Sequence, residues 1–193
     1  MSKSDHDAFT EQRQQWIISA AEACFSRAGF HGTSMADICR ESGLGAGQIY
    51  RHFSSKESIV WAAINAIAVR WRLFLQHTLP QQNSVEHLVD PHSTFWHGWP
   101  QQDRCLLLEM YSEASRNEAV REVLAQQEQQ LVRELSHAFA LTYPVMSAEQ
   151  RHQRIQFLLV LVDGVACRAV DDGDKDAQER RRINAILDRH LFT

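Results

Sequence analysis

Two pairs of acidic and imidazole side chains have a spacing that could hold metal ions. Both follow the Glu-x-x-His pattern of di-iron helical bundles, and they comprise Glu134 with His137 and Glu149 with His152. Pro144 separates the two pairs, and Glu149 falls in the first turn of its expected helix, where the helix dipole explains an acid. A helical di-metal enzyme is therefore the least supported hypothesis, and we expect no metal, no cofactor and no catalytic residue.

A second constellation is suited to DNA binding. The turn at residues 42–45, Ser-Gly-Leu-Gly, separates two short segments of helical periodicity, and Gly43 can supply the positive backbone angle of the turn. Ala46, Gly47 and Gln48 then open the second segment with small and polar side chains, which let a backbone approach base edges in a major groove. Two such helices, braced by a preceding amphipathic helix, form a helix-turn-helix.

The elements that must position these residues are helices. Apolar residues recur at helical spacing along nearly the whole chain, which predicts an all-α fold of about nine helices. Ser54 with Glu57 predicts a capping box at the start of the longest one. The expected helices cover residues 10–28, 34–42, 46–53, 54–79, 84–89, 103–115, 118–141, 147–171 and 176–191. We place a three-helix head at residues 1–55 and a ligand-binding and dimerisation body at residues 56–193.

The segment from Gly29 to Glu57 closely resembles the DNA-binding head of the TetR (AcrR-like) family of bacterial transcriptional regulators. The resemblance rests on GFHGTSMADI at 29–38, the turn at 42–45, GQIYRHF at 47–53 and SKE at 55–57. It covers about residues 12–63. It implies a homodimer that binds a palindromic operator in double-stranded DNA, with a small-molecule effector bound in the body. Repression, relieved when the effector changes the separation of the two heads, is implied by the family alone.

The pattern and the resemblance together predict the residues that lie at the DNA. Gly47 has an alternative explanation as a site of close helix packing, and Tyr50 could lie half in the core. The first 58 residues hold six basic and seven acidic side chains, and the whole chain has a net charge of −4, so specific binding should need two copies. The predicted DNA-binding residues are Thr33, Ser34, Ala46, Gly47, Gln48, Tyr50, Arg51, His52 and Lys56.

Aromatic residues concentrate between residues 71 and 99, next to an irregular segment that contains several prolines. They could line a pocket for a flat or apolar effector, or they could be ordinary core. Two acids within apolar helices, Glu109 and Asp163, could orient a ligand or could pair with an arginine. The predicted pocket residues are Trp71, Phe95, Trp96, Trp99, Cys105, Glu109, Met110 and Asp163.

The run Phe157–Val162 is apolar around the whole girth of its helix, which is typical of a helix buried on all sides. One face could fill the body core and another could contact a second copy, in a four-helix interface with the last helix. The alternative is a monomer with a buried central helix. The predicted dimer-interface residues are Phe157, Leu161, Val165, Arg168, Ile183, Ile186 and Leu187.

Composition narrows the class of protein further. The four cysteines form no Cys-x-x-Cys pair, which favours reduced thiols. The run Phe157–Val162 is the longest strongly apolar one and is far shorter than the roughly 20 residues of a membrane span, so we expect a cytoplasmic protein with no membrane partner. A remaining alternative is a ligand-independent DNA-binding or protein-interaction factor of the same fold, with residues 87–99 as its partner surface.

Overall fold

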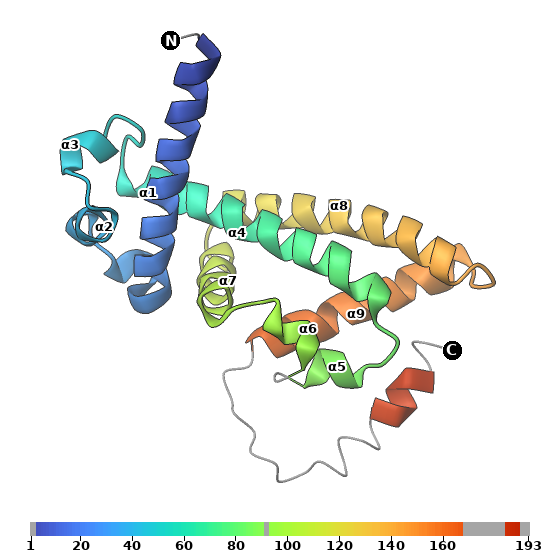
Figure 1. Ribbon diagram of the computed structural model, residues 1–193. Helices are drawn as coiled ribbons and strands as arrows, with labels where there is room; N and C mark the ends of the chain where they lie inside the picture. Colours follow the sequence, from blue (N-terminus) through green and yellow to red (C-terminus); the bar gives the residue numbers. More distant parts are fainter. Residues whose placement is uncertain (1–2, 91–92, 168–183, 190–193) are drawn as a thin grey trace. The chain divides into compact units, whose positions relative to one another are not determined.

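The computed structural model describes residues 3–90, 93–167 and 184–189. These residues form helices and no strand, which confirms the predicted all-α class (Figure 1). Residues 184–189 are also helical. The α-helices are α1 (Lys3–Gly32), α2 (Met35–Ser42), α3 (Ala46–Ile49), α4 (Lys56–Thr78), α5 (Glu86–Val89), α6 (Thr94–His97), α7 (Gln101–Ala114), α8 (Glu118–Thr142) and α9 (Ala148–Cys167), and a 3-10 helix, η1 (Leu79–Gln81), follows α4.

The chain divides into two compact units. The first comprises residues 1–68 and 101–123, and the second comprises residues 69–100 and 124–193. Helices α4 and α8 each contribute residues to both units. This division differs from the predicted head and body, because α7 and the start of α8 belong with the three N-terminal helices. The functional boundary near residue 55 stays a prediction.

The core of the first unit forms where the apolar stripe of α1 meets α2 and α3. Ile17, Ala21 and Phe25 recur at i, i+4 and i+8 on α1 and are fully buried, as are Ile38 of α2 and Ile49 of α3. Burying an isoleucine or phenylalanine side chain contributes about 1.5–3 kcal/mol. These contacts therefore hold the two short helices, which are too short to be stable alone.

Two further side chains set the geometry of the short helices. The exposed Trp16 donates its indole N–H to the carbonyl of Ser42 at 2.9 Å, which satisfies a carbonyl group at the C-terminal end of α2. Leu44, in the turn between α2 and α3, is only half-buried. Its place in the turn leaves one side of the side chain open to solvent.

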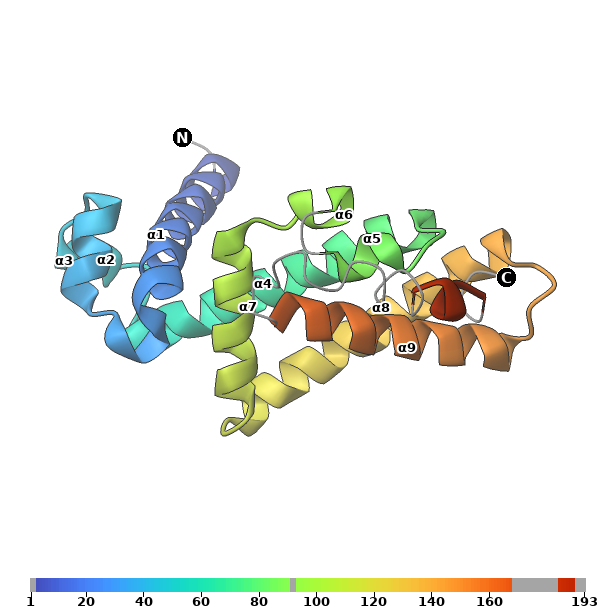
Figure 2. The same cartoon turned by 90° about the horizontal axis from the view of Figure 1, so that it is seen from below.

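Helix α1 is interrupted at Gly29, whose φ of 74° and ψ of 168° are not helical. Its φ lies in the positive region, which glycine adopts without the penalty of a Cβ. The backbone N–H of Phe30 donates to Glu109 Oε2 at 3.0 Å, and that oxygen lies 3.0 Å from where a Cβ of residue 29 would stand. Gly29 is thus required both by its backbone angle and by the close approach of α7 to the end of α1 (Figure 2).

Capping boxes stabilise the starts of α2 and α4. Ser34 and Asp37 cap α2 reciprocally. The predicted box of Ser54 with Glu57 is wrong by one residue: Ser55 and Ser58 exchange backbone-to-hydroxyl hydrogen bonds of 3.2 and 3.3 Å. Helix α4 therefore begins at Lys56. The sequence offers adjacent serines, and either one satisfies the pattern.

Among the described residues, one helical segment, Lys56–Gln81, is long and apolar enough to cross a membrane. A helix buried in the core of a protein meets the same criterion of length and composition. Ile59, Ala63, Ile64 and Ile67 are at most 1% exposed, so this segment already packs its apolar face inside the protein. The segment contains no long unbroken apolar run, because arginines and an asparagine interrupt it.

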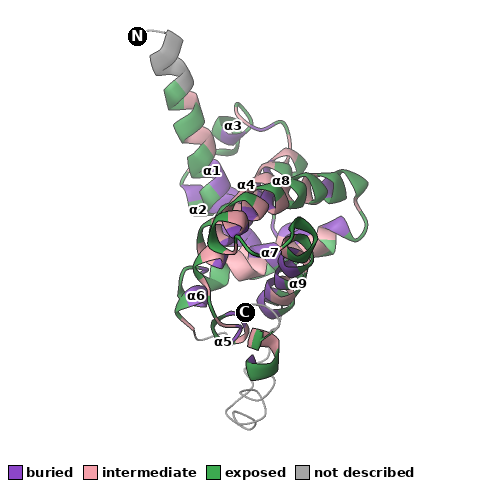
Figure 3. Cartoon of the chain, turned by 90° about the vertical axis from the view of Figure 1, so that its right-hand side faces the viewer, coloured by how far each residue is buried: buried purple, intermediate pink, exposed green. Residues whose placement is uncertain are grey.

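In the second unit, polar side chains tie the helices together. Arg72 of α4 forms an ion pair with Glu134 of α8, with 2.8 Å between Nη1 and Oε2. Asp188 accepts the backbone N–H of Val85 at 2.6 Å and so caps the start of α5 from the far end of the chain. Leu131, Leu135 and Phe139 are buried at every fourth position of α8, as expected for a helix with one face inside. Much of the α8 surface seen in Figure 3 is exposed.

We predict that Gly29→Ala lowers the free energy of unfolding by about 1–3 kcal/mol, because an L side chain is strained at this φ and its Cβ would displace the Glu109 carboxylate. Chemical denaturation of the full chain, followed by circular dichroism, measures the change. Gly32→Ala is the matched control, since its Cβ would meet only Ala28 Cβ at 3.7 Å. Equal stability of both variants would show that Gly29 is dispensable.

Candidate nucleic-acid interface

The surface of α3 is the feature best shaped to meet another macromolecule. Ala46, Gly47 and Gln48 are all exposed, while Ile49 is fully buried and anchors the helix. The backbone N–H of Gly45 donates to Gln48 Oε1 at 3.0 Å, so this side chain also caps the helix start. The helix therefore presents a short outward face on a fixed support.

Gly47 has no role in packing within the chain. A Cβ built at this position meets no heavy atom within 4 Å. The alternative that Gly47 permits close packing between helices of the same chain is therefore wrong. The absence of a side chain at Gly47 instead lets groups of another molecule come close to the backbone of α3.

The residues after α3 continue the exposed surface. Tyr50 is half exposed, Arg51 is exposed, and His52 is half-buried. They lie in the turn that follows α3, which ends at Ile49 instead of extending to residue 53 as predicted. The helix is shorter because Phe53 turns back into the core.

Two of the predicted DNA-binding residues are engaged inside the first unit. Thr33 is buried, and its hydroxyl donates to the carbonyl of Gly29 at 2.9 Å. Lys56 Nζ donates to the carbonyls of Phe30, His31 and Thr33 at 3.1, 3.5 and 2.9 Å. The ammonium thus caps the C-terminal end of α1, where a positive charge is favourable.

Ion pairs reduce the positive charge near α3. Arg27 contacts Glu41 at 2.6 Å, and Arg40 contacts Asp37. Hydrogen bonds from the hydroxyl and the backbone N–H of Ser34 lower the pKa of Asp37, so this carboxylate stays ionised in its capping role. Ser34 is therefore occupied as the cap of α2, although it remains exposed.

The predicted dimer-interface residues fall in several environments. Phe157 is 42% exposed and Ile186 is 58% exposed, whereas Val165 is buried within its own chain. Leu161 and Leu187 are half-buried, and Arg168 and Ile183 lie outside the described residues.

Sequence reasoning missed two members of an exposed stripe on α9. Val160 is 71% exposed, and Gly164 is exposed with open space around its would-be Cβ. With Phe157 they are spaced by three and four residues and so share one helix face. We call Phe157, Val160 and Gly164 the α9 stripe. The sequence signal that could have revealed this stripe is Gly164, a glycine inside a helical pattern and next to a valine.

The predicted pocket residues separate into two groups. Cys105, Glu109 and Met110 belong to the first unit, where Glu109 binds the Phe30 N–H and Met110 is core. The other five belong to the second unit. There the aromatic cluster consists of Trp71, Phe74, Phe95, Trp96 and Trp99, with centroids of contacting rings 4.8–6.2 Å apart.

One polar contact and one unpaired donor distinguish the aromatic cluster from plain core. Trp71 donates its indole N–H to Asp163 Oδ1 at 3.0 Å, which explains the acid inside α9. Trp99 is 4% exposed, and its indole N–H has no hydrogen-bond partner among the described residues. A buried donor without an acceptor costs about 1–3 kcal/mol.

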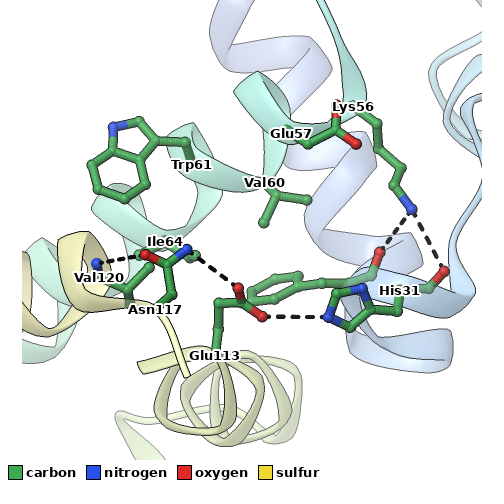
Figure 4. A pocket seen from close by; sticks show the side chains of 10 residues that line it. His31, Lys56, Glu57, Val60, Trp61, Ile64, Glu113, Asn117 and Val120 are labelled. Carbon is green, nitrogen blue, oxygen red and sulfur yellow. Dashed lines mark hydrogen bonds and ion pairs between the residues drawn. The ribbon is translucent and has the colours of Figure 1, made fainter. Parts of the chain in front are cut away.

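A cavity of about 260 Å³ lies within the first unit (Figure 4). Its walls come from the segment after the Gly29 kink, the first turns of α4, and the junction of α7 with α8. The predicted pocket residues do not line it, whereas Lys56 does. Hydrophobic periodicity could not reveal this cavity, because its walls come from three segments distant in sequence.

The Glu-x-x-His pairs do not converge. Glu134 is bound to Arg72, and His137, Glu149 and His152 are exposed. No group of three or more potential ligands stands together in the described part of the chain. Helix surface spacing accounts for both motifs without a shared ion.

Comparisons with known proteins support the interpretation of the N-terminal helices. Residues 17–63 match the family model of bacterial regulatory proteins of the tetR family. The HTH-type transcriptional regulator UidR of Escherichia coli (strain K12) is 32% identical over 108 residues, which are 56% of this chain. The matched region spans only 55% of that relative, or little more than half its length.

Two likenesses extend over most of the chain. The HTH-type transcriptional regulator BetI of Vibrio vulnificus is 24% identical over 186 residues, covering 93% of this chain and 92% of that protein. The structure of Salmonella enterica GusR aligns with a TM-score of 0.65 and 26% identity, covering 92% of both chains. The helical arrangement is therefore similar over most of the chain.

We predict that Lys56→Met destabilises the protein by about 1–2 kcal/mol, because three backbone carbonyls lose a charged donor. Denaturant titration measures this loss, and Lys56→Arg should recover part of it. Unchanged stability combined with weaker DNA binding would show that Lys56 acts through phosphate alone.

Proposed function

We propose that the chain, whose N-terminal helices match the tetR family of bacterial regulatory proteins, is a transcriptional regulator of that family and that it reads DNA with the exposed face of α3. The observation that carries the proposal is the outward face made by Ala46, Gly47 and Gln48 above a buried anchor. Two small side chains let the helix sink into the major groove. Gln48 is then close enough to hydrogen-bond a base, and glutamine pairs best with adenine.

The other DNA contacts serve to position the head. Tyr50, Arg51 and His52 lie beside α3 and reach the phosphates, which fixes the register on the duplex without reading sequence. Thr33 contributes through the shape of the turn that it stabilises. Lys56 contributes its charge to the DNA-facing end of α4 while it caps α1.

We infer that the protein acts as a homodimer on a palindromic operator. The ion pairs of Arg27 and Arg40 leave one head with a weak electrostatic hold on DNA, so two heads must act together. The α9 stripe offers an apolar, self-complementary surface, and Gly164 lets a second helix approach closely. The two heads then meet successive major grooves about 34–36 Å apart.

An effector that is small and apolar or aromatic is the proposed signal. The aromatic cluster supplies the apolar surface, and the indole N–H of Trp99 supplies a donor for an acceptor atom of the effector. Binding there shifts the population between head separations that fit DNA and those that do not. We expect repression that the effector relieves.

A ligand-independent factor of the same fold is the second candidate. In that case the N–H of Trp99 stays unpaired and the aromatic cluster is permanent core. DNA binding that no aromatic or apolar metabolite alters would favour this candidate, whereas effector-dependent release favours the first.

We predict that selection from a random DNA pool, at low and moderate salt, enriches a palindrome with two equal half-sites. Gln48→Ala should relax the choice at one position of each half-site by about 5–150-fold, since one bidentate contact contributes about 1–3 kcal/mol. Gln126→Ala, an exposed change in α8, is the control. An unaltered preference in Gln48→Ala would refute the assignment of Gln48.

We predict that Val160→Glu raises the dimer dissociation constant at least about 100-fold, because it would bury an uncompensated charge between two copies. Sedimentation velocity over a range of concentrations measures the change. Leu141→Glu, also at a highly exposed apolar position but off the α9 stripe, should leave the dimer intact. A variant Val160→Glu that still dimerises like the wild type would place the interface elsewhere.

A further inference from the structure

We propose that the cavity of the first unit is a binding site for a compact aromatic amine, separate from the aromatic cluster of the second unit. Its apolar wall consists of Phe30, Val60, Trp61, Ile64 and Val120. Phe30, Ile64 and Val120 are at most 2% exposed, while Trp61 is 40% exposed at the rim. The cavity thus has a closed apolar floor and an aromatic edge against which a ring can stack.

The size of the cavity limits the ligand. A volume of about 260 Å³ lies just below the range of about 300–1,000 Å³ that is usual for drug-sized ligands. A single aromatic ring with a short side chain fits such a space, whereas a fused polycyclic molecule or a nucleotide does not.

Hydrogen-bonding capacity determines the charge of the ligand. Lys56 also lines the cavity, but its three N–H groups all point to backbone carbonyls, so it has none left for an anion. Figure 4 shows two of these hydrogen bonds. The carboxylates of Glu57 and Glu113 also line the cavity and can only accept. The polar rim therefore favours a donor that carries positive charge.

Both carboxylates are ionised. Burial raises the pKa of Glu113, but hydrogen bonds from Arg116 and Asn117 outweigh it, and the pKa lies below its usual value. Hydrogen bonds to its own backbone N–H and to Ser55 lower the pKa of Glu57.

His31 is already engaged by its neighbours at the rim. Its Nε2 lies 2.9 Å from Arg116 Nη2 and 3.4 Å from Glu113 Oε2. Arg116 in turn is held by Glu113 at 2.6 Å and does not line the cavity. A ligand ammonium group thus meets two carboxylates and no free cation of the rim, with its ring between Trp61 and the apolar floor.

The test is calorimetric titration of the full chain, without DNA, at neutral pH. Phenethylamine is the probe, and 2-phenylethanol and 3-phenylpropionate are its neutral and anionic counterparts of similar size. We expect saturable binding of the amine with a Kd on the order of 1 mM, as its few heavy atoms allow. The alcohol should bind at least tenfold more weakly, and the carboxylate should not bind. Equal binding of amine and alcohol, tighter binding of the carboxylate, or no saturable heat would each overturn the proposal.

Variants locate the site. Glu113→Gln should weaken amine binding at least fivefold, while Glu118→Gln, an exposed change in the first turn of α8, should not. Val60→Phe should fill the cavity and abolish binding while the melting temperature remains near that of the wild type. If Val60→Phe is folded and binds the amine normally, the site is not this cavity. Because DNA is absent, each outcome is independent of the proposed regulator function.

Discussion

The first unit depends on one backbone constraint, the positive φ of Gly29 held against the carboxylate of Glu109. The kink turns the chain out of α1 so that the Phe30 N–H meets Glu109 and the next carbonyls converge on Lys56. The same kink brings Phe30 into the cavity wall. A side chain at residue 29 would disturb a helix end, an α1–α7 contact and a cavity together, which is why a single glycine matters more here than its size suggests.

Local signals in the sequence were enough for the fold and for the outline of the site. Periodicity placed the helices, and glycines and capping residues placed most of their ends, because these effects act within one or two turns. Such local signals do not fix the exact residue where two adjacent residues fit the same capping pattern, as Ser54 and Ser55 do at the start of α4. The exposure of Gln48 and the burial of Ile49 also followed from local spacing.

What the sequence could not reveal are contacts between distant segments. Glu109 was assigned to a pocket, yet it binds the Phe30 backbone 79 residues away in sequence. Lys56 was assigned to DNA binding, and its capping of α1 depends on the path of the chain after Gly29. The outer face of α9 was misassigned for another reason. It is apolar like the inner face, so no stripe of polar residues distinguishes the exposed Val160 from the buried Val165 in the sequence.

The tie between Asp188 and Val85 has a consequence for biosynthesis. The first unit is complete once residue 123 has been made, but the start of α5 lacks its acceptor until Asp188 emerges. At typical rates of translation, the 65 residues from 123 to 188 take about 3–13 s to synthesise. The N-terminal helices can therefore fold on the ribosome while the second unit is still incomplete and has an unsatisfied backbone N–H group. Chaperones that act on nascent chains would then bind the second unit and not the first.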